Sequence, residues 1–159
     1  MTNLTQKEKY LLEDQKSHEE LCIKKYTNYA NQSKDAELKQ LFLNNAQQEQ
    51  EHLNSINQIL NGQVPNVNQQ QGGQQSNSQQ QSSQMKSNEG SGLYNQNDAD
   101  LCTDLLATEK YVSSTYDTAI FEFRDANIRN VLNHIQKEEQ EHGESIFKYM
   151  ESKGMYNPQ

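Results

Sequence analysis

The sequence contains an internal repeat, and this repeat constrains the fold more than any other feature. When residues 11–60 are placed against residues 101–150, at a constant offset of 90, no gap is needed. Twelve positions then hold identical residues, against roughly three expected for unrelated sequences. Named by their first member, the identical pairs are Leu11, Asp14, Glu19, Tyr26, Asp35, Ala36, Glu49, Gln50, Glu51, His52, Ser55 and Ile56. The chain therefore consists of two copies of one unit.

Both copies have the pattern of paired amphipathic helices. Residues 5–60 and 98–153 contain no proline and, apart from Gly143, no glycine, and their apolar residues recur at steps of three and four. Each copy is too long for one globular helix, and Asp35 and Asp125 are suitable N-caps for a second one. We predict helices over about residues 5–31, 35–60, 98–123 and 126–153, within a single domain of residues 1–159.

The two copies are separated by a stretch of different composition, residues 61–97. This stretch is rich in Gln, Asn, Ser and Gly and has almost nothing apolar to bury. Such a composition cannot offset the entropy of ordering the chain, so we expect a disordered crossover linker. The predicted fold is an all-α four-helix bundle made of two duplicated helical hairpins joined by this linker.

Composition and charge exclude several classes of partner. The net charge is −8 at pH 7 and no cluster of Lys and Arg exists, which argues against binding to nucleic acid or anionic membranes. No stretch approaches the roughly 20 apolar residues of a membrane span, and residues 1–10 lack the apolar core of a signal peptide. We therefore expect a cytosolic protein in which Cys22 and Cys102 stay reduced and are buried as small apolar residues.

The apolar face of every predicted helix is interrupted near its middle by a glutamate. In the second helix of each copy, the motif EQEH places a histidine three residues after the inward glutamate, on the same face. The six inward polar residues are Glu19, Glu49, His52, Glu109, Glu139 and His142. Four carboxylates and two imidazoles are thus predicted to point at one another in the bundle interior.

Such a cluster is unfavourable unless positive charge lies among the carboxylates, because each buried ion is desolvated and the like charges repel. Two divalent cations balance four carboxylates. A Glu from two helices with Glu-x-x-His from the other two is also the ligand set of dimetal carboxylate bundles. These donors suit iron or manganese, and zinc also fits. The alternative is a protonated, hydrogen-bonded polar layer inherited from a metal-binding ancestor.

Other residues near the predicted site have simpler interpretations. Tyr26 and Tyr116 share the face of the predicted ligands and are either hydrogen-bond donors to the carboxylates or plain core residues, the second being favoured. His18 and His134 lie beside the inward faces, and we expect them at the surface or its boundary. The acidic neighbours of Glu139 in the run EEQE are expected to face solvent.

The second copy resembles a known family. The runs EKYVSSTY, IRNVLNHIQKEEQ and IFKYM, with the closing Gly-x-Tyr-x-Pro, resemble the Coat F family of bacterial spore coat proteins over residues 105–158. Met155 departs from the aromatic residue usual in that closing motif. The first copy shares this likeness only through the duplication. The helical pairs, the six inward positions and the long connection also resemble the ferritin-like fold.

Two hypotheses of function follow. The resemblance implies a structural component of the endospore coat, made in the cytoplasm of the mother cell and assembled with other coat proteins or with itself. The second hypothesis is a dimetal redox protein with iron or manganese, either a ferroxidase or a peroxide-detoxifying enzyme. No Cys-x-x-Cys pair exists for an attached rubredoxin-like iron centre, so a peroxidase of the rubrerythrin kind would lack its usual electron donor. The two hypotheses are compatible.

Overall fold

The computed structural model describes residues 3–66 and 94–158, and within these ranges all regular structure is helical. The four helices are α1 (Gln6–Gln32), α2 (Ala36–Leu60), α3 (Gln96–Glu122) and α4 (Ala126–Ser152). The predicted all-α four-helix bundle of two hairpins is confirmed. Most of the predicted linker, residues 67–93, lies outside the described residues, and so does the expectation that it is disordered.

The helices of both hairpins begin at N-cap residues in equivalent positions. Thr5 caps α1 and Asn95 caps α3, while Asp35 caps α2 and Asp125 caps α4; each side chain accepts a hydrogen bond from a backbone N–H of the first turn. The two caps predicted from sequence are therefore confirmed. Both pairs of caps are related by the offset of 90. The structural repeat thus begins before the first identical residue.

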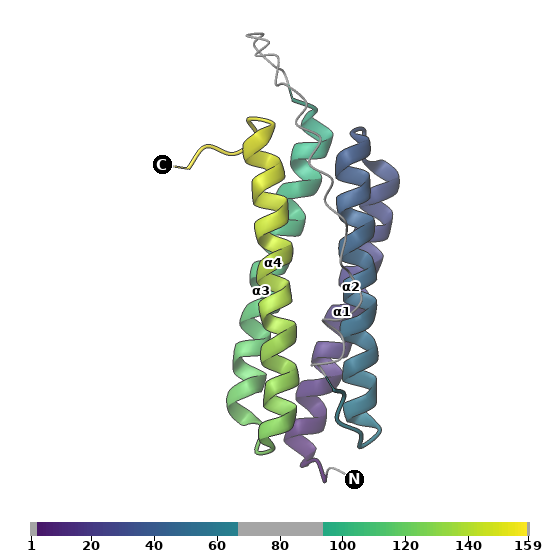
Figure 1. Ribbon diagram of the computed structural model, residues 1–159, viewed down its shortest axis with the longest axis vertical. Coiled ribbons are helices and arrows are strands. Elements are labelled where there is room, and N and C mark those ends of the chain that lie inside the picture. The colour runs from purple at the N-terminus through teal and green to yellow at the C-terminus, as the bar shows by residue number, and fades with distance from the viewer. Residues whose placement is uncertain (1–2, 67–93, 159) are drawn as a thin grey trace.

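The hairpins are related by an approximate twofold axis perpendicular to the bundle. α1 packs along α2 and α3 along α4, and the hairpins meet where α1 contacts α3 and α2 contacts α4. In Figure 1 the chain runs up α1, down α2, down α3 and up α4, so each of these contacting pairs is antiparallel. Equivalent residues of the two hairpins consequently face each other across the middle of the bundle.

The core consists of apolar side chains on both sides of a central polar layer. One end contains Leu12, Ile56, Ala119 and Leu132, and the other contains Leu38, Phe42, Leu105 and Ile146, all fully buried. Each Leu, Ile or Phe buried in this way contributes about 1.5–3 kcal/mol. Both cysteines are buried and free. Within the described residues, none of the helices has the length and apolar character needed to cross a membrane.

Each hairpin supplies one buried carboxylate that binds the interhelical turn of the other hairpin. Glu8 accepts a hydrogen bond of 3.0 Å from the backbone N–H of Arg124 and forms an ion pair of 3.2 Å with its guanidinium. Asp98 accepts from the backbone N–H groups of Lys34 and Asp35 at 2.8 and 3.0 Å. Glu8 and Asp98 are also related by the offset of 90. Together they fix how far the hairpins overlap along the bundle.

Candidate metal centre

The structure brings all six predicted ligands together in the middle of the bundle. α1 and α3 each supply one glutamate, whereas α2 and α4 each supply the Glu and the His of one EQEH motif. None of these six side chains is more than 2% exposed. The residues brought together are Glu19, Glu49, His52, Glu109, Glu139 and His142.

The ligand atoms form two overlapping groups of four. Within each group, one ligand atom per residue can be chosen so that all four atoms lie within 4.8 Å of one another. The first group comprises Glu19, Glu49, His52 and Glu139, and the second comprises Glu49, Glu109, Glu139 and His142. Glu49 and Glu139 belong to both groups, so each of these carboxylates could serve two cations. The arrangement therefore provides two neighbouring positions, each completed by one further glutamate and one histidine.

Both imidazoles direct Nδ1 into the cluster. His52 Nδ1 lies 3.0 Å from Glu49 Oε2 and 3.2 Å from Glu139 Oε1. His142 Nδ1 lies 3.2 Å from Glu49 Oε1 and 3.5 Å from Glu139 Oε2. The two rings stack on each other with 5.7 Å between centroids. Each histidine thus presents one ring nitrogen to the shared carboxylates.

The outward nitrogen of each imidazole has an acceptor on the opposite hairpin. His52 Nε2 lies 2.8 Å from Glu138 Oε2, and His142 Nε2 lies 2.9 Å from Gln48 Oε1. A proton on Nε2 can donate to these oxygens, which leaves the lone pair of Nδ1 directed at the cluster. Gln48 and Glu138 are related by the offset of 90. The supporting contacts are therefore as reciprocal as the ligands.

Glu138 was expected to face solvent with the other acids of its run, and this expectation is wrong. Its side chain is 26% exposed and is held between two histidines, with Oε2 on His52 and Oε1 3.4 Å from His134 Nε2. A signal was present in the sequence, because Glu138 lies one helical turn before His142 and therefore close to the inward face. Its binding to a histidine of the other hairpin depends on tertiary packing.

Glu19 and Glu109 each belong to one ligand group only, and we call them the terminal glutamates. Each of them accepts a hydrogen bond from a tyrosine of the other hairpin. Tyr26 of α1 donates to Glu109 of α3, and Tyr116 of α3 donates to Glu19 of α1. Both tyrosines are fully buried. Asn45 also donates to the Tyr26 hydroxyl at 3.2 Å. The rings fill the core, as the favoured interpretation held, but the hydroxyls position the carboxylates, as the alternative proposed.

Several buried polar atoms of the cluster have no hydrogen-bond partner. Within residues 3–66 and 94–158, all the buried side-chain nitrogen and oxygen atoms without a hydrogen bond belong to five of the six predicted ligands. These atoms are Glu19 Oε2, Glu49 Oε1, Glu109 Oε2, both carboxylate oxygens of Glu139, and His142 Nδ1. Leaving one such group unsatisfied costs about 1–3 kcal/mol. The donor set therefore fits a pair of cations, which would bind these oxygens and this nitrogen.

Burial and mutual repulsion separate the pKa values of the four carboxyl groups. Burial, with the charge of Glu139, raises the pKa of Glu19 well above its ordinary value and that of Glu109 to about 7. Burial also opposes ionisation of Glu49 and Glu139, but the two adjacent imidazoles in their protonated form outweigh it, so the pKa values of Glu49 and Glu139 are lowered. Protons and cations thus compete for the same atoms, and cation binding would release protons.

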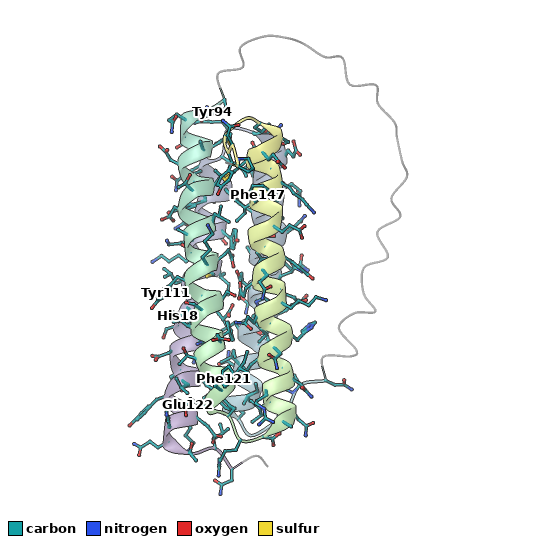
Figure 2. All side chains as sticks on the ribbon, turned by 90° about the vertical axis from the view of Figure 1, so that its left-hand side faces the viewer. His18, Tyr94, Tyr111, Phe121, Glu122 and Phe147 are labelled. Atoms are coloured by element: carbon teal, nitrogen blue, oxygen red, sulfur yellow. The ribbon has the colours of Figure 1, made fainter. Side chains whose placement is uncertain are left out.

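The remaining two histidines lie at the boundary of the bundle, as expected. His18 Nδ1 is 3.3 Å from Thr115 Oγ1, and its ring meets Tyr111 edge to face with 5.5 Å between centroids. Figure 2 shows His18 and Tyr111 beside each other on the outside of the bundle. His134 has a side-chain exposure of 17% and contacts the cluster only through Glu138. Neither histidine belongs to a ligand group.

Comparison with known families supports the resemblance described for the second half of the chain. The family model for the Coat F domain matches residues 97–159, which cover nearly all of α3 and the whole of α4. The second hairpin is thus similar to the Coat F domain. Searches of curated proteins and of solved structures found no match. In this chain the hairpin that matches the Coat F model packs against a diverged repeat of itself, α1 and α2, which carries the same Glu and His residues in the same register.

Proposed function

We propose that this protein is a structural component of the bacterial endospore coat, and that its bundle binds two divalent metal ions. The match of the second hairpin to the Coat F model supports the role in the coat. The observation that carries metal binding is the pair of ligand groups sharing Glu49 and Glu139, in which the unsatisfied buried atoms of the described residues are concentrated. This ligand order and the crossover between α2 and α3 are those of ferritin-like dimetal bundles.

Iron or manganese suits the proposed centre best, because carboxylate oxygen dominates the donor set and imidazole completes it; zinc also fits. One ion would lie between Glu19 and His52, and the other between Glu109 and His142. Glu49 and Glu139, which belong to both groups, would help to hold both ions. Two divalent ions balance the charge of four carboxylates. A bound iron or manganese pair would supply redox chemistry, while the chain's own contribution is to orient the ligands through buried hydrogen bonds.

The metal proposal is tested by ion content and by melting temperature. The parent should contain about two ions per chain after purification from iron- and manganese-supplied cells, because the six ligands form one complete set. Its stability should rise by about 2.7 kcal/mol at a hundredfold excess of Fe(II) or Mn(II) over Kd. The double variant Glu49→Gln/Glu139→Gln should not respond. Before metal is added it should be as stable as the parent or more so, because two buried like charges are removed.

The EQEH motifs also provide the matched control. Glu51→Gln/Glu141→Gln makes the same chemical change twice, in the same helices, at exposed positions. This variant should respond to metal as the parent does. Equal responses of the parent and of Glu49→Gln/Glu139→Gln would overturn the metal proposal and favour the inherited polar layer.

The coat proposal implies outward contacts with other coat proteins or with further copies of this chain. Large aromatic side chains are available on the outside of the bundle: Tyr10, Tyr111 and Phe121 are 63%, 60% and 84% exposed. Figure 2 labels the last two on α3. Fractionation of sporulating cells tests the proposal. The protein should move from the cytoplasm of the mother cell into the coat extract of purified spores, and its retention in the soluble fraction would contradict this role.

A further inference from the structure

The two ends of the ligand cluster differ in what covers them. A cavity of about 460 Å³ lies in the groove between α3 and α4, lined among others by Leu106, Glu109, Ser113, Glu139, Gly143 and Phe147. Figure 2 faces this groove and shows Phe147 between the two helices. Glu109 belongs to the second ligand group alone, whereas Glu139 belongs to both groups. The cavity therefore extends from the surface to the side chains of Glu109 and Glu139, and the unpaired carboxylate oxygens of these residues lie buried behind it.

The repeat shows why the cavity lies on this side. Gly143 and Ser113 in its wall correspond, at the offset of 90, to Leu53 and Ile23 in the first hairpin. Both large residues are half-buried. Two small residues thus stand beside one metal position where two large apolar residues stand beside the other.

The backbone does not require glycine at position 143. Among the described glycines, positive φ occurs only at Gly62 and Gly154. A Cβ built on Gly143 would lie 3.7 Å from Leu106 Cδ1 and 4.0 Å from Glu109 Cβ, both ordinary contacts. Glycine inside a helix costs about 0.8–1.0 kcal/mol relative to alanine. Gly143 therefore leaves room for at least a methyl group next to Leu106 and Glu109.

The imidazoles are also supported unequally. His52 is backed by the Glu138 carboxylate, which is itself in contact with His134, whereas His142 is backed by the neutral amide oxygen of Gln48. A carboxylate partner makes an imidazole more basic and a stronger ligand than a neutral partner does. The large apolar residues beside the cluster and the carboxylate partner of His52 thus both favour tighter retention of a metal ion at the position formed by Glu19 and His52.

We propose that the two metal positions have different roles. The position formed by Glu109 and His142 exchanges its ion and takes a small exogenous ligand, of the size of peroxide or azide, through the cavity beside Gly143. The position formed by Glu19 and His52 is closed and retains its ion. This inference rests on the proposed metal binding.

Release of Co(II) to excess EDTA tests the inference, because cobalt is visible by absorption and needs no turnover. The parent, loaded with two ions, should release them in two phases of equal amplitude. Gly143→Leu, which copies the first hairpin, should slow the fast phase by about tenfold or more, since obstruction acts on the rate of dissociation. Leu53→Ala should accelerate the slow phase. Azide should change the cobalt spectrum of the parent and have little effect on that of Gly143→Leu.

The outcomes separate this inference from the metal proposal. Failure of the parent to bind cobalt, iron or manganese would overturn both. Binding of two ions that leave in one phase, or a fast phase unaffected by Gly143→Leu, would overturn only the inequality of the positions. Equilibrium stoichiometry and circular dichroism of the two variants verify that they fold and bind; if Gly143→Leu does not fold, Gly143→Val replaces it in the same measurement.

Discussion

The two hairpins agree in their proposed ligands and differ in the residues that surround them. Both carry a lone glutamate, a Glu-x-x-His motif and a tyrosine that donates to the glutamate of the other hairpin. They differ at the residue behind the histidine, which is Gln48 or Glu138, and at the wall beside the cluster, which is Leu53 or Gly143. The residues proposed to bind metal are thus alike in the two hairpins, while the residues around them have diverged.

Substitution of the proposed ligands should have the largest effect on metal binding. Glu49→Gln should weaken binding at both metal positions, and Glu139→Gln should do the same, because each carboxylate belongs to both groups. Glu19→Gln and Glu109→Gln should each weaken only one position and leave about one ion per chain. Calorimetric titration with Mn(II) gives the stoichiometries. If all four variants lose the same number of ions, the assignment of shared and terminal ligands is wrong.

The next prediction concerns the carboxylates that fasten the hairpins together. Glu8→Gln should destabilise the protein by about 2 kcal/mol, since it removes a buried carboxylate hydrogen-bonded to Arg124. Asp98→Asn should cost less, because Asp98 accepts from the backbone N–H groups of Lys34 and Asp35 and, within the described residues, forms no ion pair such as that of Glu8 with Arg124. Urea denaturation at pH 7 measures both. A larger cost for Asp98→Asn would contradict this ranking.

The cost of Glu8→Gln should depend on pH. Although burial opposes it, hydrogen bonds from Arg124 and Thr5 lower the pKa of Glu8 from 4.5 to about 2. A lowered carboxyl pKa adds stability above the unfolded value and loses it as the pH falls toward the folded value. The difference between parent and variant should therefore be constant above about pH 5 and shrink between pH 4.5 and 2. A pH-independent difference would assign the effect to packing.

A smaller effect is expected from the two tyrosines. Tyr26→Phe and Tyr116→Phe each remove one hydroxyl that holds a terminal glutamate. Loss of such a supporting hydrogen bond typically lowers metal affinity by about tenfold or somewhat more. The two variants should resemble each other, because the contacts are reciprocal. Mn(II) titration monitors the affinity, and no change in either variant would return these tyrosines to a plain core role.

The smallest prediction concerns Gly143. Gly143→Ala should stabilise the protein by about 0.5–1 kcal/mol, because the added methyl group meets only ordinary contacts and alanine favours the helix. Thermal melting before metal addition measures this gain. Leu53→Ala, at the equivalent position, should instead lose stability, since it removes half-buried apolar atoms. Destabilisation by both substitutions would show that the cavity wall does not tolerate a methyl group.

Much of this arrangement could be predicted from sequence, because helical periodicity and the offset of 90 determine which side chains point inward. The caps Asp35 and Asp125 and the convergence of the six ligands follow from these two patterns. The contact of Glu138 with His52 could not be predicted, since it depends on how the hairpins pack. The contacts of Glu8 and Asp98 with the opposite turns were not predicted, because these two equivalent residues are not identical and also lie outside the aligned ranges. The cavity beside Gly143 required side-chain packing to be known.

The twofold relation of the hairpins has a consequence for how such a centre can evolve. A single hairpin that paired with an identical copy would build the same six-ligand cluster, but every substitution would occur twice. Glycine beside one ion would then mean glycine beside the other, and both ions would be equally open. Once the two hairpins belong to one gene, Leu53 and Gly143 can be selected independently. Duplication within the chain thus allows a division of labour that a symmetric homodimer cannot encode.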